Sequence, residues 1–282
     1  MKLAASIVRM TVPAILLLAI TAACQAEDLF PDKNLEAVVR QYVFEKRNKP
    51  DPLVEADVQN IAIITGKGKK IANLKGLEKC KSLASLDLEN NEIVDLSPIK
   101  ELKSLQSLIL AKNKIESIAP LADLTGLQLL WIQDNQIADV SALAKMTAMG
   151  SLDLSNNKIK DIAPLSSVTK IHALYLTANP VTDLKPLASL KNLARLDLRG
   201  CGVSDISPLA GLTEWKFLFL HNNKLTDLGV LVSMAKKDFD GPKRFSPYWN
   251  VYIGENPLSD EAKTKQIEEL KKYGTRVFLT YP

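Results

Sequence analysis

The sequence has 282 residues, with 36 Lys or Arg against 32 Asp or Glu, so its net charge is only +4. This lacks the strongly basic domain or stripe of nucleic-acid-binding proteins, and we expect no nucleic-acid partner. The two histidines, His172 and His221, have no Cys or His at ligand spacing, so we expect no metal site and no cofactor.

The N-terminal residues have the three-part order of a bacterial export signal. Two basic residues, Lys2 and Arg9, are followed by an apolar run at 10–20 and small residues at 21–23. This run is well short of the roughly 20 apolar residues that a membrane-spanning helix needs. We therefore expect a signal peptide and an exported protein.

The signal peptide has two candidate ends. Residues 22–24, Ala-Ala-Cys, resemble the end of a lipobox, the bacterial lipoprotein motif whose cysteine is lipidated, although Thr21 stands where that family usually has Leu. This interpretation makes 1–23 the signal peptide and Cys24 a lipid anchor at the membrane or cell envelope. The alternative is cleavage after Ala26, which gives a secreted or periplasmic protein.

A period of 22 residues organises most of the chain. Asparagine recurs at this spacing, with one cysteine in the series: Asn91, Asn113, Asn135, Asn157, Asn179, Cys201 and Asn223. Ahead of each lies an apolar triplet at fixed offsets, the first being Leu83, Leu86 and Leu88. Seven consecutive copies match L-x-x-L-x-L-x-x-N/C, the leucine-rich-repeat signature. The alternating leucines predict short strands that stack into a parallel sheet.

The second half of each repeat predicts a helical turn. Asp-[Leu/Ile]-x-Pro-[Leu/Ile] occurs four times, first at 95–99 and last at 205–209. Proline suits the first position of such a turn, and the preceding Asp can cap it. The repeated asparagine is expected to bond the neighbouring backbone, whereas Cys201 loses most of that bonding.

We therefore predict an α/β fold, a leucine-rich-repeat solenoid. It is a curved right-handed coil with a parallel β-sheet on the concave face and short 3₁₀ turns on the convex face. The repeats span 61–229, after a helical N-terminal cap at 27–60. The last, irregular repeat and a C-terminal helix–strand cap occupy 230–282, because the terminal coils of a solenoid must be covered. The insertion within 230–249 is predicted to be a solvated convex helix, with a binding loop as the alternative.

The repeats and their convex motif, with the lead-in at 30–36, resemble the internalin-type bacterial leucine-rich-repeat proteins. The resemblance implies a curved binding module whose partner is read by the concave strand residues. No L-P-x-T-G sorting motif or hydrophobic tail follows the repeats, so neither an invasion role nor a partner is carried over.

The remaining cysteines are predicted to be buried free thiols. Cys80 aligns with core leucines, and Cys201 falls in the asparagine series. They are about five and a half coils apart, roughly 25 Å, which is beyond the reach of a disulfide.

The solvent-facing strand positions carry an unusual number of large side chains. The candidate binding residues are Ile109, Leu129, Trp131, Asp153, Tyr175, Arg195, Asp197, Arg199, Phe217, Phe219 and Tyr252. Exposed apolar groups of this extent mark interaction sites, and aromatic residues with nearby Arg are common hot spots. Trp131, Tyr175 and Phe219 share one column at intervals of two coils, which suits an extended partner surface.

Catalysis is not expected on this face. Asp153 and Asp197 are two coils apart, roughly 9–10 Å, at the upper end of the range of inverting glycosidases. However, Tyr175 lies between them, Arg195 and Arg199 would keep Asp197 ionised, and an open sheet offers no pocket to raise a pKa.

The sequence predicts an exported, monomeric, non-catalytic module that recognises a protein of unknown identity. One alternative is a cell-envelope glycan stacked on Trp131 and Tyr175 beside Asp153 and Asp197. Another is a structural spacer of the envelope, which would need no exposed apolar patch.

Overall fold

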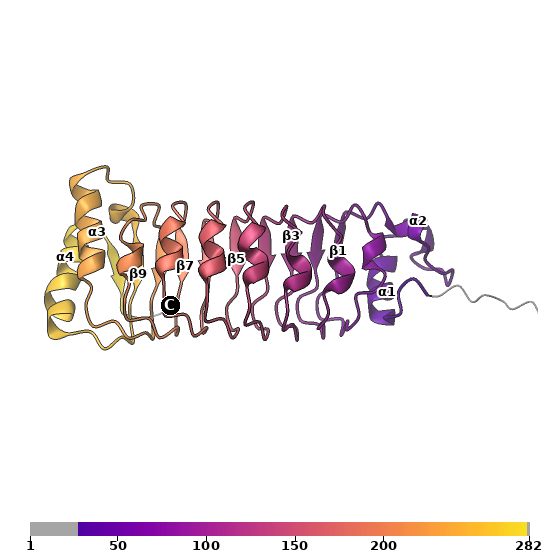
Figure 1. Cartoon of the computed structure of the whole chain (residues 1–282), viewed down its shortest axis with the longest axis horizontal. Coiled ribbons are helices and arrows are strands. Elements are labelled where there is room, and N and C mark those ends of the chain that lie inside the picture. The colour runs from indigo at the N-terminus through magenta and orange to yellow at the C-terminus, as the bar shows by residue number, and fades with distance from the viewer. Residues whose placement is uncertain (1–27, 281–282) are drawn as a thin grey trace, which may run out of the picture.

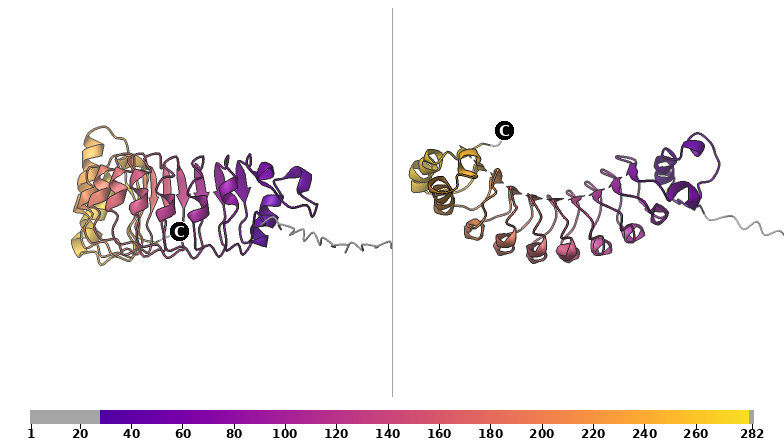
Figure 2. Two further views of the ribbon diagram at one scale, coloured as in Figure 1. Left: turned by 45° about the vertical axis from the view of Figure 1, so that its right-hand side comes forward. Right: turned by 90° about the horizontal axis from the view of Figure 1, so that it is seen from above.

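The structure, a computed structural model, describes residues 28–280 as a row of stacked coils (Figure 1). Viewed from above, the coils form an arc whose inner edge carries the strands and whose outer edge carries short helical turns (Figure 2). The predicted curved solenoid with a concave sheet is therefore confirmed. The predicted signal peptide at 1–23 and the lipidation site Cys24 lie outside the described residues.

Within residues 28–280, ten three-residue strands form one parallel sheet in chain order. They are β1 (Ile63–Thr65), β2 (Ser85–Asp87), β3 (Ser107–Ile109), β4 (Leu129–Trp131), β5 (Ser151–Asp153), β6 (Ala173–Tyr175), β7 (Arg195–Asp197), β8 (Phe217–Phe219), β9 (Asn250–Tyr252) and β10 (Arg276–Phe278). The middle residue of each strand from β1 to β9 is fully buried. Adjacent strands pair without slippage, as Leu130 opposite Leu152 shows, so equivalent repeat positions form continuous columns.

Short 3₁₀ turns line the convex side, as predicted. Those of the repeats are Leu77–Lys79, Ser97–Ile99, Ala119–Leu121, Ser141–Lys145, Ala163–Ser167, Lys185–Ser189 and Ser207–Leu209. In five of these seven turns proline takes the first or second position, as Pro186 does. Asp183 then accepts a hydrogen bond from the N–H of Lys185 at 2.9 Å, which stabilises the entry to the turn.

The repeated asparagines tie successive coils together. Nδ2 of Asn135 donates to the carbonyls of Ile132, in its own coil, and Leu110, in the preceding coil, both at 3.0 Å. Its Oδ1 accepts from the N–H of Ile115 at 2.9 Å. The predicted role of this amide is thus confirmed. At the equivalent position, Sγ of Cys201 reaches the carbonyl of Leu176 at 3.2 Å but does not replace the amide oxygen.

Two helices, α1 (Lys33–Arg40) and α2 (Glu55–Val58), with a 3₁₀ turn at Phe44–Lys46, form the predicted N-terminal cap. Asp32 fastens the cap to the first coil. Its Oδ1 accepts from the first turn of α1, and its Oδ2 accepts from the N–H groups of Ala72 and Asn73. Burial raises the pKa of Asp32, but four backbone N–H bonds outweigh this and hold it below its ordinary value.

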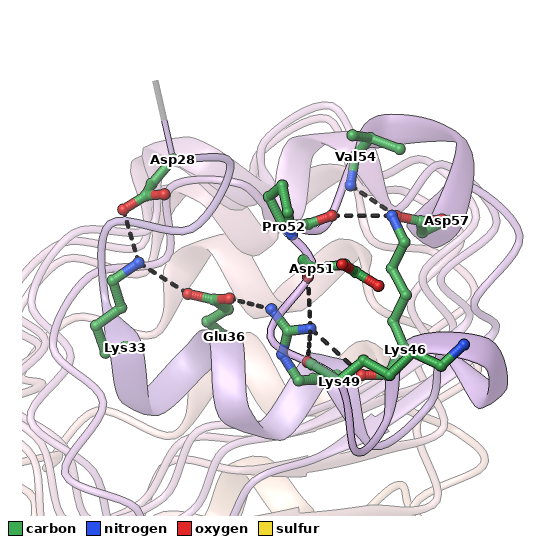
Figure 3. A network of polar contacts seen from close by, with 10 residues as sticks. Asp28, Lys33, Glu36, Lys46, Lys49, Asp51, Pro52, Val54 and Asp57 are labelled. Atoms are coloured by element: carbon green, nitrogen blue, oxygen red, sulfur yellow. Dashed lines mark hydrogen bonds and ion pairs between the residues drawn. The ribbon is translucent and has the colours of Figure 1, made fainter. Parts of the chain in front are cut away.

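A polar network shapes the loop between these helices (Figure 3). Arg40 pairs with Glu36 and donates to the backbone carbonyls of Lys49 and Asp51 at 3.0 and 2.8 Å. The cap therefore shields the end of the core and holds its own loop by charge-assisted bonds.

The C-terminal cap contains the insertion. Helix α3 (Gly229–Asp240) and a 3₁₀ turn at Ser246–Tyr248 precede β9, and a π-helical turn, Ala262–Gln266, leads into α4 (Ile267–Lys272) and β10. The predicted convex helix is present, but it is not simply solvated: it buries Leu231, Met234 and Ala235 against the core. The loop after α3 is held by Asp238, which accepts backbone N–H bonds from residues 244–246.

Cys80 and Cys201 are both buried and free, as predicted. Burial raises the pKa of the Cys80 thiol to about 12 and that of Cys201 to about 11, so both are poor nucleophiles. In the part of the chain that the structure describes, no helix has the length and apolar character needed to cross a bilayer.

Candidate functional site on the concave face

Two columns of side chains run along the concave face because the strands pair in register. The first strand residues are Ile63, Ser85, Ser107, Leu129, Ser151, Ala173, Arg195, Phe217, Asn250 and Arg276. The third strand residues are Thr65, Asp87, Ile109, Trp131, Asp153, Tyr175, Asp197, Phe219, Tyr252 and Phe278. Every predicted binding residue lies in these columns except Arg199, which follows Asp197 by two positions.

The middle of the face is open to solvent. We call Ile109, Leu129, Trp131, Asp153 and Tyr175 the central strip; Trp131 is exposed and the other four are partly exposed. Trp131 is 38% exposed, whereas Trp215 and Trp249, the other tryptophans of the sequence, are buried. The indole Nε1 of Trp131 donates to Oγ of Ser151 at 3.3 Å, so the ring extends toward the coil of β5.

Asp153 is a carboxylate within this strip. Its Oδ1 accepts the backbone N–H of Ser155 at 2.9 Å. Burial raises its pKa above the ordinary value of 3.8, the Ser155 bonds oppose this, and the negative charges of Asp197 and Asp134 add to the rise. Among residues 28–280, no Lys or Arg forms an ion pair with Asp153.

Asp197, at the same repeat position two coils later, is already paired with an arginine of the chain. Nε of Arg199 lies 2.9 Å from its Oδ1, and Nη2 lies 2.6 Å from its Oδ2. The Asp197 side chain is nearly inaccessible, whereas that of Arg199 remains partly exposed. This bidentate pair fixes both side chains, so Asp197 is not available as a base.

The aromatic side chains beyond β7 stack on one another. Ring centroids are 6.1 Å apart for Phe217 and Phe219, 4.6 Å for Phe219 and Tyr252, and 4.4 Å for Tyr252 and Phe278. The guanidinium of Arg195 lies 4.1 Å from the Phe217 centroid. We call Arg195, Asp197, Arg199, Phe217, Phe219 and Tyr252, with Phe278, the C-terminal cluster.

This packing corrects part of the sequence interpretation. Asp197 and Phe219 were expected to face solvent, but they are only 2% and 8% exposed. The reason is lateral cover: Arg199 lies against Asp197, and the rings of Phe217 and Tyr252 lie against Phe219. Phe219 is thus no exposed partner of Trp131 and Tyr175.

Sequence reasoning missed Phe278 as a member of the column. A closing strand was expected there, but its alignment with Tyr252 depends on how α4 returns the chain to the sheet. The only available signal was that Phe278 is the aromatic residue in the middle of the short apolar stretch 277–279.

The ionisable side chains of the concave face were compared with the arrangements that acid–base and metal sites need. Asp153 and Asp197 do not form a free acid–base pair, because Arg199 neutralises Asp197. His221 is buried, and burial lowers its pKa. No group of three or more His, Cys, Asp or Glu in the described range 28–280 is placed to hold a metal ion.

The model of the family described as "Leucine Rich repeats (2 copies)" matches residues 103–145, 151–189 and 191–233. No curated protein matches the chain. Among solved structures, the chain is similar to internalin C2 from Listeria monocytogenes, with 28% identity over 89% of this chain and 95% of that chain, at a TM-score of 0.60.

Two more distant structures share the fold alone. A leucine-rich-repeat protein of Leptospira interrogans is 21% identical over 73% of this chain and 57% of that chain, with a TM-score of 0.62. A plant peptide hormone receptor in complex with RGF2 is 18% identical over 65% of this chain and 30% of that chain, with a TM-score of 0.54.

Proposed function

Because this chain is a leucine-rich-repeat protein with a fold similar to that of an internalin, we propose that it binds a protein partner through the concave face. Leucine-rich-repeat proteins of this kind are typically non-catalytic binding modules. The peptide hormone receptor with the same fold, solved as a complex, is consistent with such a role.

The observation that carries the proposal is the exposed central strip. Trp131 is 38% exposed on a sheet whose strands are locked in register, and Leu129 and Ile109 lie beside it. An exposed tryptophan on a rigid apolar surface loses little conformational entropy on binding and is the residue type most enriched in binding hot spots. A protein surface would bury this strip without rearranging the solenoid.

We also propose that the protein is exported and monomeric, with Cys24 as a lipid anchor. The support is the order of charged, apolar and small residues at 1–23. Mass spectrometry of the mature N-terminus tests this: a lipidated Cys24 is expected, and an unmodified start at Glu27 would show a soluble secreted form instead.

The experiment for binding compares two exposed aromatic residues. Trp131→Ala is tested beside Phe44→Ala, which removes an 84% exposed ring from the N-terminal cap. Binding to protein components of an envelope extract should fall about 30-fold for the first variant and stay unchanged for the second. Equal binding by both variants and the wild type would contradict a role for the concave face.

A glycan partner is the second candidate, because Trp131 and Tyr175 also present flat rings beside Asp153. Protease treatment of the captured material separates the two: a protein partner is lost, whereas a glycan remains bound. A structural spacer would show no dependence on Trp131 in either case.

A further inference from the structure

Two coils of the concave face share the sequence Leu-Asp-Leu and differ in the residue on each side of it. The coil of β5 reads Ser-Leu-Asp-Leu-Ser over 151–155, and the coil of β7 reads Arg-Leu-Asp-Leu-Arg over 195–199. The aspartates stand in the same column and accept the same backbone bond, from the N–H of Ser155 at 2.9 Å and of Arg199 at 3.1 Å. The local backbone setting of the two carboxylates is therefore equivalent.

In the coil of β7 the chain supplies its own cations. Arg199 holds Asp197 with two charge-assisted bonds while its guanidinium lies 5.6 Å from the Phe219 centroid. Arg195 lies over the Phe217 ring. This arrangement combines a carboxylate with aromatic faces around a guanidinium, and each contact favours the cation.

In the coil of β5 the arginines are missing, but the carboxylate and neighbouring aromatic rings are present. Ser151 and Ser155 stand where the arginines are, so neither position supplies a cation to Asp153, and the nearby Arg195 acts on Tyr175 instead. The register places Trp131 on one side of Asp153 and Tyr175 on the other, each about 4.8 Å away along the sheet.

We propose that Asp153, Trp131 and Tyr175 form a subsite for an arginine or lysine side chain of the partner protein. This rests on the proposed protein-binding function and names the chemistry of one contact within it. The carboxylate accepts hydrogen bonds from the cation, and the two rings cover its flanks. The charge of Asp134, which disfavours ionisation of Asp153, favours a positive group beside it.

The subsite requires that the Asp153 carboxylate bind the cation in its ionised form. A neutral sugar stacked on the rings would place no such demand on the charge of Asp153. Replacement of the carboxylate by an amide of the same shape therefore distinguishes an ionic contact from simple stacking.

The test uses a display library of random 12-residue peptides, selected on the immobilised wild-type protein. Peptides that need Trp131, which bind the wild type but not Trp131→Ala, are kept. We expect arginine or lysine in these peptides at one fixed position. Each selected arginine peptide is then synthesised with citrulline, a neutral isostere, and both forms are titrated against the wild type and Asp153→Asn.

Removing either charge should weaken binding by tenfold or more, and removing both should weaken it no further. Asp87→Asn is the matched control: Asp87 has the same strand context, Ser-Leu-Asp-Leu, but its column neighbours are Thr65 and Ile109. This control should bind like the wild type.

Two results would overturn the subsite in different ways. Peptides that need Trp131 but bind Asp153→Asn as tightly as the wild type would refute the cation contact and leave the binding face intact. If no selected peptide needs Trp131, the subsite and the proposed use of the central strip for protein binding both fail.

Discussion

The central strip and the C-terminal cluster lie on one sheet face, in the same columns, and both combine aromatic rings with an aspartate. In the C-terminal cluster, Phe219 stacks between Phe217 and Tyr252, and Arg199 neutralises Asp197. In the central strip, Trp131 is exposed and Asp153 has no basic partner within residues 28–280. The difference arises from the particular side chains that each coil carries in and beside its strand, not from the repeat pattern itself.

This contrast shows why position on the concave face does not by itself identify a binding residue. The C-terminal cluster satisfies its own charges and apolar surfaces, so truncation there should reduce stability. The central strip leaves apolar surface exposed and, among residues 28–280, gives Asp153 no basic partner, so truncation there should reduce binding. Each of the following substitutions tests one side of this contrast.

The largest effect is expected from Phe219→Ala. This removes a nearly buried ring from the stack and should lower the free energy of unfolding by about 3 kcal/mol. Chemical denaturation measures the change, and partner binding measured well below the melting temperature should be nearly unaffected. An undiminished stability together with weaker binding would place Phe219 in the recognition surface after all.

Arg199→Ala should cost about 2 kcal/mol of stability, because it leaves the Asp197 carboxylate buried without its partner. The figure is below that of a fully buried pair because Arg199 is partly exposed. The double variant Arg199→Ala/Asp197→Asn removes the orphan charge and should recover much of the loss. Failure of this recovery would mean that Arg199 stabilises by packing on Phe219 rather than by pairing.

Tyr175→Ala should weaken partner binding by about 2 kcal/mol, roughly 30-fold, with a shift in melting temperature of only a few degrees. Tyr175 is half-buried in the central strip, and the core leucine beside it, Leu174, stays in place. Calorimetric titration and thermal unfolding give the two values. A large loss of stability with unchanged binding would show that Tyr175 stabilises the fold, as Phe219 does, and does not contact the partner.

The smallest effect concerns pH. The folded-state pKa of Asp153 is raised, mainly by burial, so the folded protein holds this proton more tightly than the unfolded chain does. Wild-type stability relative to Asp153→Asn should therefore rise modestly as pH falls through the raised pKa toward 3.8, and level off below it. Unfolding both proteins across this window gives the difference. A slope of opposite sign would show that a cation stabilises the carboxylate within the folded chain.

Much of the fold followed from the sequence because each repeat satisfies its own requirements locally. The 22-residue period set the register, Asp183 and its equivalents marked the convex turns, and Asn135 and its equivalents bonded adjacent coils. The two buried thiols, Cys80 and Cys201, followed from the same alignment.

The accessibility of the concave residues could not be predicted from the alignment of the repeats. Alternation along a strand places Phe219 on the concave side, but its cover comes from Phe217 and Tyr252, and their rotamers depend on packing across strands. The continuation of this stack to Phe278 depends on the path of α4 after the irregular repeat. Such contacts join residues far apart in the sequence, so repeat periodicity does not reveal them.

The most direct test of the contrast is to give the coil of β5 the cation that the coil of β7 already has. In Ser155→Arg, the new guanidinium stands where Arg199 stands relative to Asp197, and the Ser151–Trp131 hydrogen bond is retained. Partner binding, measured beside thermal unfolding, should fall at least tenfold while the melting temperature is maintained or raised. Wild-type binding by a folded Ser155→Arg protein would contradict the claim that the unoccupied Asp153 makes the central strip the recognition surface.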